Sequence, residues 1–171
     1  MNTMQQSAKR QNNQSQKILR IIDSLYLLLL GIGIGGIIAC GMFAAPIIFH
    51  ATDFISEQAA SAFSNIDSGQ IMGQIFLRLN YYLQVLLVAI IAYELFHVIS
   101  NHHYARIWLI FGFINVVCIA LFVWYYTPFI LEKENLRADN FQAMHAQSVW
   151  VSKILLINLS VVFIGRAYTL R

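Results

Sequence analysis

Four long apolar stretches, separated by polar connections, dominate the hydrophobic pattern of the chain. They cover residues 24–49, 71–100, 107–131 and 148–165. Each is close to the ~20 residues that a helix needs to cross a hydrocarbon core of ~30 Å. The pattern therefore predicts an all-α fold, a polytopic membrane protein built as a four-transmembrane-helix bundle.

The composition agrees with a membrane location. Of the 171 residues, 58% are hydrophobic and only 11% are charged, roughly half the charged share of a soluble domain. Residues 1–17 are rich in Gln, Asn and Ser, so we expect a disordered cytoplasmic tail there. Residues 18–171 should form one four-helix transmembrane domain. The net charge of +3 is too small to indicate a nucleic-acid partner.

The distribution of positive charge predicts the orientation of the helices. Lys and Arg near the ends of membrane helices favour the cytoplasmic side. The connections at 51–70 and 132–147 carry more acidic than basic residues, so we expect a multi-pass protein of the inner membrane with both termini in the cytoplasm. The cations on the cytoplasmic side are Lys9, Arg10, Lys17, Arg20, Arg106, Arg166 and Arg171.

Small residues form a ridge along the first apolar stretch. Gly31, Gly35 and Ala39 recur every four positions, a spacing that lets two membrane helices approach closely. The other helices of the same chain are the expected partners of this ridge; a homo-oligomer or another membrane protein is the alternative. Pro46 should kink or end the outer part of this helix.

The second apolar stretch carries an unusual polar stripe. At ~100° per residue, Gly73, Asn80, Gln84 and Glu94 fall on one face of a helix, which should be turned toward the bundle interior. Polar groups in the membrane are costly and often functional, so the three polar side chains are candidate ligand-binding residues. The alternative is a structural role through hydrogen bonds between helices.

A second candidate site lies at the outer membrane surface. His50 ends the first stretch, His145 precedes the fourth, and Arg78 and Lys153 lie deeper on the same side. Together they predict a cationic, partly hydrated vestibule for an anionic group. No cofactor is required by this arrangement. The alternatives are a two-histidine site at His50 and His145 for haem b or copper, or histidines that only anchor the protein at the headgroup level.

Four segments of the chain resemble the transmembrane-protein-205-like family, which contains the domain of unknown function 4149. The resemblance covers about residues 25–163. The four segments are 41–49 (GMFAAPIIF), 68–76 (SGQIMGQIF), 125–128 (YYTP) and 141–149 (FQAMHAQSV). The positions that match the family are Pro46, Phe49, Gly69, Gly73, Phe76, Pro128 and His145, of which the prolines and Gly73 would be structural; Asn158 departs from the asparagine position expected near the start of the fourth helix.

The resemblance implies a four-helix membrane bundle of undetermined biochemistry. A vertebrate member of the family is associated with resistance to a platinum drug, which suggests the handling of soft metals or xenobiotics. A weaker similarity to membrane-bound porphyrinogen oxidases suggests a haem or porphyrin enzyme instead.

Three classes of function follow from these observations. We expect a small-solute or metal- and xenobiotic-handling membrane protein with a polar outer vestibule. The alternatives are an accessory or interaction subunit without a ligand, and a haem- or porphyrin-binding membrane oxidase. Because no motif of known catalytic chemistry stands out, the sequence favours a protein that is not an enzyme.

Overall fold

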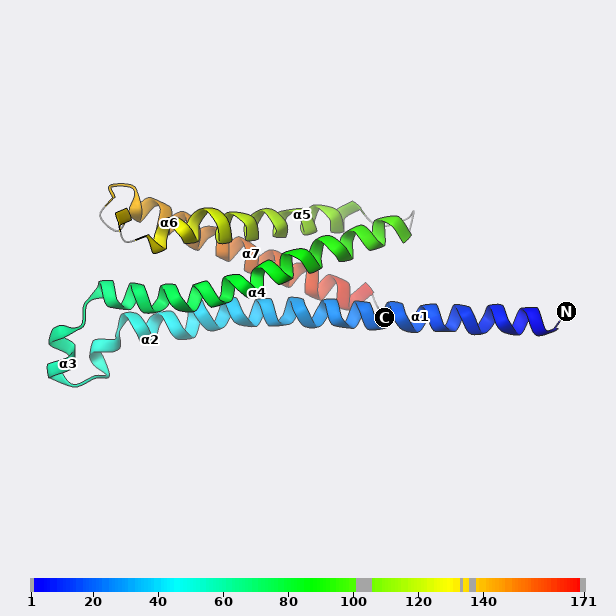
Figure 1. The fold of residues 1–171 in the computed structure, drawn as a ribbon, viewed down its shortest axis with the longest axis horizontal. Coiled ribbons are helices and arrows are strands. Elements are labelled where there is room, and N and C mark those ends of the chain that lie inside the picture. The colour runs from blue at the N-terminus through cyan, green and yellow to red at the C-terminus, as the bar shows by residue number, and fades with distance from the viewer. Residues whose placement is uncertain (1, 101–105, 133, 136–137, 170–171) are drawn as a thin grey trace.

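The computed structural model describes residues 2–100, 106–132, 134–135 and 138–169. Every regular element in these residues is a helix (Figure 1). Long helices lie side by side in a bundle. The elements in chain order are α1 (Asn2–Ile38), the π-helical turn η1 (Ala39–Ala44), α2 (Ala45–Phe49), the 3-10 turn η2 (Ala51–Asp53), α3 (Glu57–Ala62), α4 (Asn65–Ser100), α5 (Arg106–Ala120), the π-helical turn η3 (Leu121–Tyr126), α6 (Thr127–Leu131) and α7 (Phe141–Thr169).

The predicted four-helix membrane bundle is confirmed. Within the described residues, four helical segments are long and apolar enough to cross a membrane: Asn13–Phe49, Asn65–Ser100, Arg106–Leu131 and Phe141–Thr169. The first combines α1, η1 and α2, and the third combines α5, η3 and α6. All four extend beyond or to the limits of the apolar stretches, because polar residues at their ends continue the same helices.

The bundle has two ends that differ in structure (Figure 1). At the end that we call the termini end, α4 and α7 finish, α5 begins, and the N-terminal part of α1 projects beyond the other helices. At the opposite end, the loop end, η2 and α3 connect α2 to α4, and α6 leads toward α7.

The projecting part of α1 occupies the segment expected to be a tail. The helix already begins at Asn2, and the side chains of residues 13–20 are exposed. A helix without packing partners is marginal in water, because most helical stability in proteins comes from tertiary contacts. The disordered tail over residues 1–17 therefore stays a prediction.

Each π-helical turn ends two residues before a proline. Pro46 follows η1 and Pro128 follows η3, each within the first two positions of a short α-helix. Proline cannot donate a backbone hydrogen bond, and a π turn shifts the bonding register of the residues around it. At η3 the Thr127 hydroxyl donates to the Phe122 carbonyl at 2.7 Å, which satisfies an acceptor at the break. Both spans thus continue past their prolines toward the loop end.

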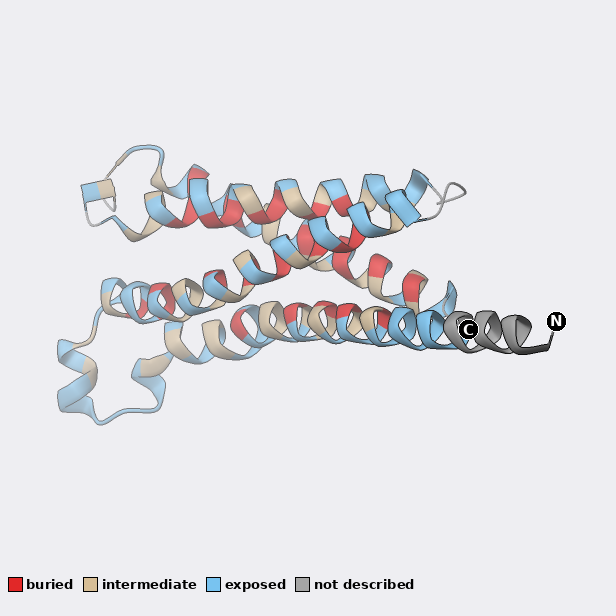
Figure 2. Cartoon of the chain, turned by 45° about the vertical axis from the view of Figure 1, so that its right-hand side comes forward, coloured by how far each residue is buried: buried red, intermediate tan, exposed pale blue. Residues whose placement is uncertain are grey.

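Side chains of all four long helices form one apolar core (Figure 2). Figure 2 shows buried residues recurring along the helix faces that are turned toward neighbouring helices, with exposed residues on the outward faces. Exposed apolar side chains on the outward faces suit contact with lipid. The fully buried apolar residues are Leu30, Leu83, Leu86, Ile90, Ile119, Leu155, Leu159 and Val162.

Glycines on α1 face different surroundings. A Cβ added at Gly33 would lie 2.7 Å from Leu86 of α4, so the absence of a side chain lets these two helices approach. Gly31 lies beside Phe163 of α7, with 3.6 Å between the added Cβ and the ring, whereas nothing lies within 4 Å of the corresponding point at Gly35. At the loop end, a Cβ at Gly73 would collide with Leu131, so α4 and α6 also meet through a glycine.

Candidate functional site

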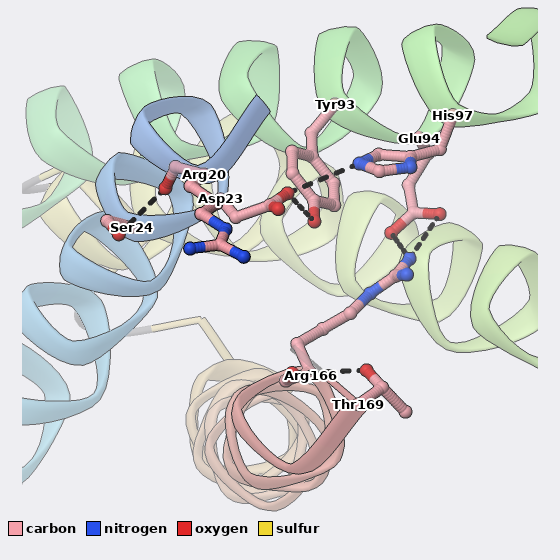
Figure 3. Close-up of polar contacts among 8 residues, drawn as sticks. All are labelled: Arg20, Asp23, Ser24, Tyr93, Glu94, His97, Arg166 and Thr169. Atoms are coloured by element: carbon pink, nitrogen blue, oxygen red, sulfur yellow. Dashed lines mark hydrogen bonds and ion pairs between the residues drawn. The ribbon is translucent and has the colours of Figure 1, made fainter. Parts of the chain in front are cut away.

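Ionisable side chains from three helices meet inside the termini end of the bundle (Figure 3). We call Asp23, Tyr93, Glu94, His97 and Arg166 the termini-end cluster. Asp23 comes from α1, Arg166 from α7 and the other three from two neighbouring turns near the end of α4. Asp23, Tyr93, Glu94 and Arg166 are all buried, between 5% and 8% exposed.

Glu94 and Arg166 form a two-pronged ion pair in the cluster. A terminal nitrogen of Arg166 donates to both carboxylate oxygens of Glu94, at 2.9 and 3.1 Å. The carboxylate lies against Gly112 of α5, where an added Cβ would come within 3.0 Å of the Glu94 side chain. Buried charges are tolerated when they are paired and hydrogen-bonded, so this contact joins α4 and α7 where a lone charge would not be stable.

Aromatic rings hold the Arg166 guanidinium in place. Its central carbon lies 5.2 Å from the centre of the Tyr93 ring and 4.9 Å from the centre of the Trp108 ring. A guanidinium over an aromatic face gains electrostatic attraction that grows when the pair is shielded from water. Trp108 packs closely on Gly165, the residue before Arg166, so a missing side chain makes room for this arrangement.

Asp23 connects α1 to α4. The Tyr93 hydroxyl donates to Asp23 Oδ1 at 2.8 Å, and His97 Nε2 lies 3.4 Å from the same oxygen. The Tyr93 ring stacks on Tyr26 with centroids 3.7 Å apart and planes 8° from parallel. These contacts fix the carboxylate at the point where α1 crosses α4. The Asp23 and His97 side chains are 12% and 20% exposed, so this part of the cluster lies closest to water.

The cluster carries two carboxylates and one permanent cation. Arg166 balances Glu94 directly, and His97 is the basic side chain within ion-pair distance of Asp23. Desolvation favours neutral combinations of buried groups. The Asp23–His97 pair is neutral overall when it holds one proton, on the imidazole or on the carboxylate. The arrangement therefore places an acid and a base in contact at the termini end of the bundle.

The polar stripe predicted on α4 does not form one pocket. Asn80 is buried and its Oδ1 has no hydrogen-bond partner among the described residues, whereas Gln84 is half-buried. Glu94 lies fourteen residues beyond Asn80, about 21 Å along a helix. A single small ligand cannot bridge that distance, so only Glu94 belongs to the cluster.

The four residues of the predicted outer vestibule all lie exposed. His50 Nδ1 is 2.9 Å from the Pro46 carbonyl, His145 stacks on Phe141 of the same helix, and Lys153 lies over Trp150. For Arg78 the structure shows an exposed side chain on α4. Across the described residues, no hydrogen bond, ion pair or ring contact joins any two of the four. The vestibule, with its haem or copper alternative, stays a prediction.

Metal binding has no evident centre in the part of the chain that the structure describes. No group of three His, Cys, Asp or Glu side chains lies close enough there to hold an ion. Asp23 and His97 lie close together and could supply two ligands. The nearby carboxylate of Glu94 is paired with Arg166 instead.

Sequence reasoning identified one ionisable member of the cluster, Glu94, as a candidate site residue. Arg166 was counted only among the charges that orient the protein, and Asp23 and Tyr93 were not singled out. A usable signal was present, since a carboxylate in an apolar stretch needs a cation at similar depth. Arg166, near the end of the fourth stretch, lies on the same side of the bundle as Glu94.

One family model matches the chain. It is described as a domain of unknown function (DUF4149), and the match covers residues 28–139. This range includes most of the bundle, from α1 through α6, and ends before α7. No curated protein and no solved structure matches the chain.

Proposed function

Because the chain belongs to the DUF4149 family and forms a multi-pass membrane bundle, we propose that it is a proton-dependent, small-solute-handling protein of the inner membrane. The Asp23–His97 pair is the proton-binding element. The solute class suggested by the family resemblance is a soft metal or a xenobiotic.

The observation that carries the proposal is the surplus of acid in the termini-end cluster. Glu94 and Arg166 pair through two hydrogen bonds, and Asp23 contacts the Tyr93 hydroxyl and His97. Ionisable groups inside membrane bundles pair with one another and mark ion pathways and proton relays. His97 Nε2 lies 3.4 Å from Asp23 Oδ1 and the imidazole is 20% exposed, so it is placed between Asp23 and water.

A change in protonation would act directly on the helix contacts. Asp23 is the carboxylate that ties α1 to Tyr93 and His97 of α4. The Tyr93 ring also stacks on Tyr26 of α1 and lies under Arg166 of α7. A change in the charge of the Asp23–His97 pair would therefore affect contacts of three helices. A change in the protonation of the Asp23–His97 pair would change the strength of the contact between α1 and α4. Proton binding could in this way be coupled to helix movement.

The closed core favours a second candidate function. Leu30, Leu86, Ile90 and Leu159 are fully buried across the middle of the bundle. One chain in this conformation therefore offers no evident polar path through its core, and transport would need helix rearrangement or an oligomer. An accessory or interaction subunit needs neither, and in such a protein the cluster would only fasten the helix ends together.

We also propose that both termini face the cytoplasm. The support is the excess of Lys and Arg at the termini end, which follows the usual charge bias of membrane proteins. A reporter that is active only in the periplasm should be silent when fused to the C-terminus and active when inserted near Ser64. Activity at the C-terminal fusion would contradict this orientation.

The proton role can be tested in proteoliposomes. The protein would be reconstituted with an imposed pH gradient, and the accumulation of soft metal ions and small organic cations would be measured. Asp23→Asn and His97→Gln should abolish the effect of the gradient. Asp67→Asn, which changes a half-buried carboxylate at the loop end that accepts from Ser64, should preserve it. Undiminished gradient-driven accumulation in Asp23→Asn would refute the proton role. Variants that lose only thermal stability, with no solute accumulated by the parent, would favour the accessory function.

A further inference from the structure

An apolar groove of about 460 Å³ runs along the outer surface between α1 and α7. Leucines and an isoleucine of α1 form one wall, Phe163 of α7 forms the other, and Gly31 lies between them, 3.6 Å from its ideal Cβ position to the Phe163 ring. The lining residues are Ser24, Leu27, Leu28, Gly31, Ile32 and Phe163. The groove belongs to the outward surface of two membrane spans, so its natural contents are apolar.

Two cations stand at the polar end of this groove. Lys17 and Arg20 precede Ser24 by two turns and one turn of α1, on the same helix face. Both are exposed, and neither has an ion pair with any described residue. Figure 3 shows the Arg20 side chain extending from α1 between Ser24 and Asp23. The Ser24 hydroxyl donates to the Arg20 carbonyl at 2.8 Å.

We infer that the α1–α7 groove binds one anionic phospholipid of the surrounding bilayer. The phosphate lies between Lys17 and Arg20, and an acyl chain follows the groove past Gly31. The distance along α1 from Arg20 to Gly31 is about 16 Å at the helical rise, close to half of a ~30 Å hydrocarbon core. Headgroup cations and apolar groove therefore span one leaflet, as a lipid does. Basic pockets between helices are a recurring form of anionic-lipid site.

Charge distinguishes this occupant from a second copy of the chain. Two copies in the same membrane orientation, packed symmetrically through this face, would bring Lys17 and Arg20 of each copy toward those of the other. Like charges at close range repel. An anionic headgroup neutralises the same two side chains. The inference concerns the outward face of α1 and goes beyond the proton-binding role proposed for the inward-facing cluster.

Native mass spectrometry of the full-length, detergent-purified protein can measure the binding. The protein would be titrated separately with phosphatidylglycerol and with phosphatidylcholine. We expect one tightly bound phosphatidylglycerol. Lys17→Gln/Arg20→Gln should weaken it about 30-fold, because two charges that contact the headgroup are lost. Arg106→Gln is the matched control, since it removes an exposed cation at the same end from α5 and should leave the affinity within about twofold.

A second pair of variants tests the apolar part of the site. Gly31→Leu fills the groove and should reduce phosphatidylglycerol binding, whereas Gly41→Leu, where an added Cβ has no neighbour within 4 Å, should not. Equal affinity for the two lipids, or equal loss in Arg106→Gln and the double variant, would overturn the inference. A dimer that persists without lipid and is broken by Gly31→Leu would show that a second copy occupies the groove instead.

Discussion

Replacing one member of the Glu94–Arg166 pair should destabilise the protein more than replacing both. Each residue is about 5% exposed and the pair makes two hydrogen bonds, so either single substitution leaves a buried charge without its counterion. Such a change typically costs about 3–5 kcal/mol, whereas apolar replacement of both partners is often neutral or stabilising. We expect the unfolding free energy of Glu94→Leu/Arg166→Met to lie close to that of the parent. The double-mutant cycle should give a coupling energy of about 3 kcal/mol or more.

The two single variants should differ in a definite direction. Arg166 lies three residues from the end of α7 and has a long side chain, so in Glu94→Leu its charge can reach water beyond the last turn. Glu94 lies six residues, about 9 Å, from the end of α4 and has a short side chain. Arg166→Met, which also removes the contacts with Tyr93 and Trp108, should therefore be the more damaging change.

Equilibrium unfolding in mixed detergent micelles, followed by circular dichroism of the helices, measures these differences. Arg78→Met is the control, because Arg78 is exposed on the same helix as Glu94 and its loss should change the unfolding free energy by less than about 0.5 kcal/mol. If the losses of the two single variants simply add in the double variant, within about 0.5 kcal/mol, the pair is not energetically coupled and the reasoning from burial is refuted.

Three further outcomes are expected. Gly165→Ala should destabilise the protein by about 1–3 kcal/mol, because its Cβ collides with Trp108, and equal stability of Gly165→Ala and Gly41→Ala in the same unfolding assay would contradict this packing. Asn115→Leu should stabilise the protein by about 1–3 kcal/mol, since both amide atoms are buried without a hydrogen-bond partner among the described residues. A loss of stability in this variant would mean that the two amide atoms do form hydrogen bonds. The absorption spectrum of purified protein should lack a Soret band, and a band abolished by His145→Ala would instead establish the haem alternative.

The four spans were predictable because they depend on one local property. A run of apolar residues long enough to cross the bilayer forms a helix whatever its neighbours are, since its backbone groups must be satisfied within the segment. The π-helical turns at η1 and η3 were not predicted. A hydropathy pattern contains no information on a shift in backbone hydrogen-bond register. Pro46 and Pro128 indicated only that the regular helical hydrogen bonds would be interrupted.

The cluster was harder to predict because it depends on how the helices are rotated against one another. Glu94 stood out as a carboxylate in an apolar stretch. Asp23 lies at the border between the basic segment and the first apolar stretch, where an acidic residue usually faces water, and Arg166 had a sufficient explanation in the charge bias. Only the packing of α1 and α7 around α4 shows that these three side chains turn inward.

Neighbouring residues of α1 connect the two sites proposed for this protein. Asp23 points into the cluster, where Tyr93 donates to it, whereas Ser24 lines the outward groove. A lipid that orders this turn of α1 would change the geometry of the Asp23 carboxylate, and movement of Asp23 on protonation would change the groove. Thermodynamic linkage makes such an effect reciprocal. Phosphatidylglycerol should therefore bind with pH-dependent affinity in the parent and with pH-independent affinity in Asp23→Asn/His97→Gln, and an unchanged pH dependence in that double variant would separate the two sites.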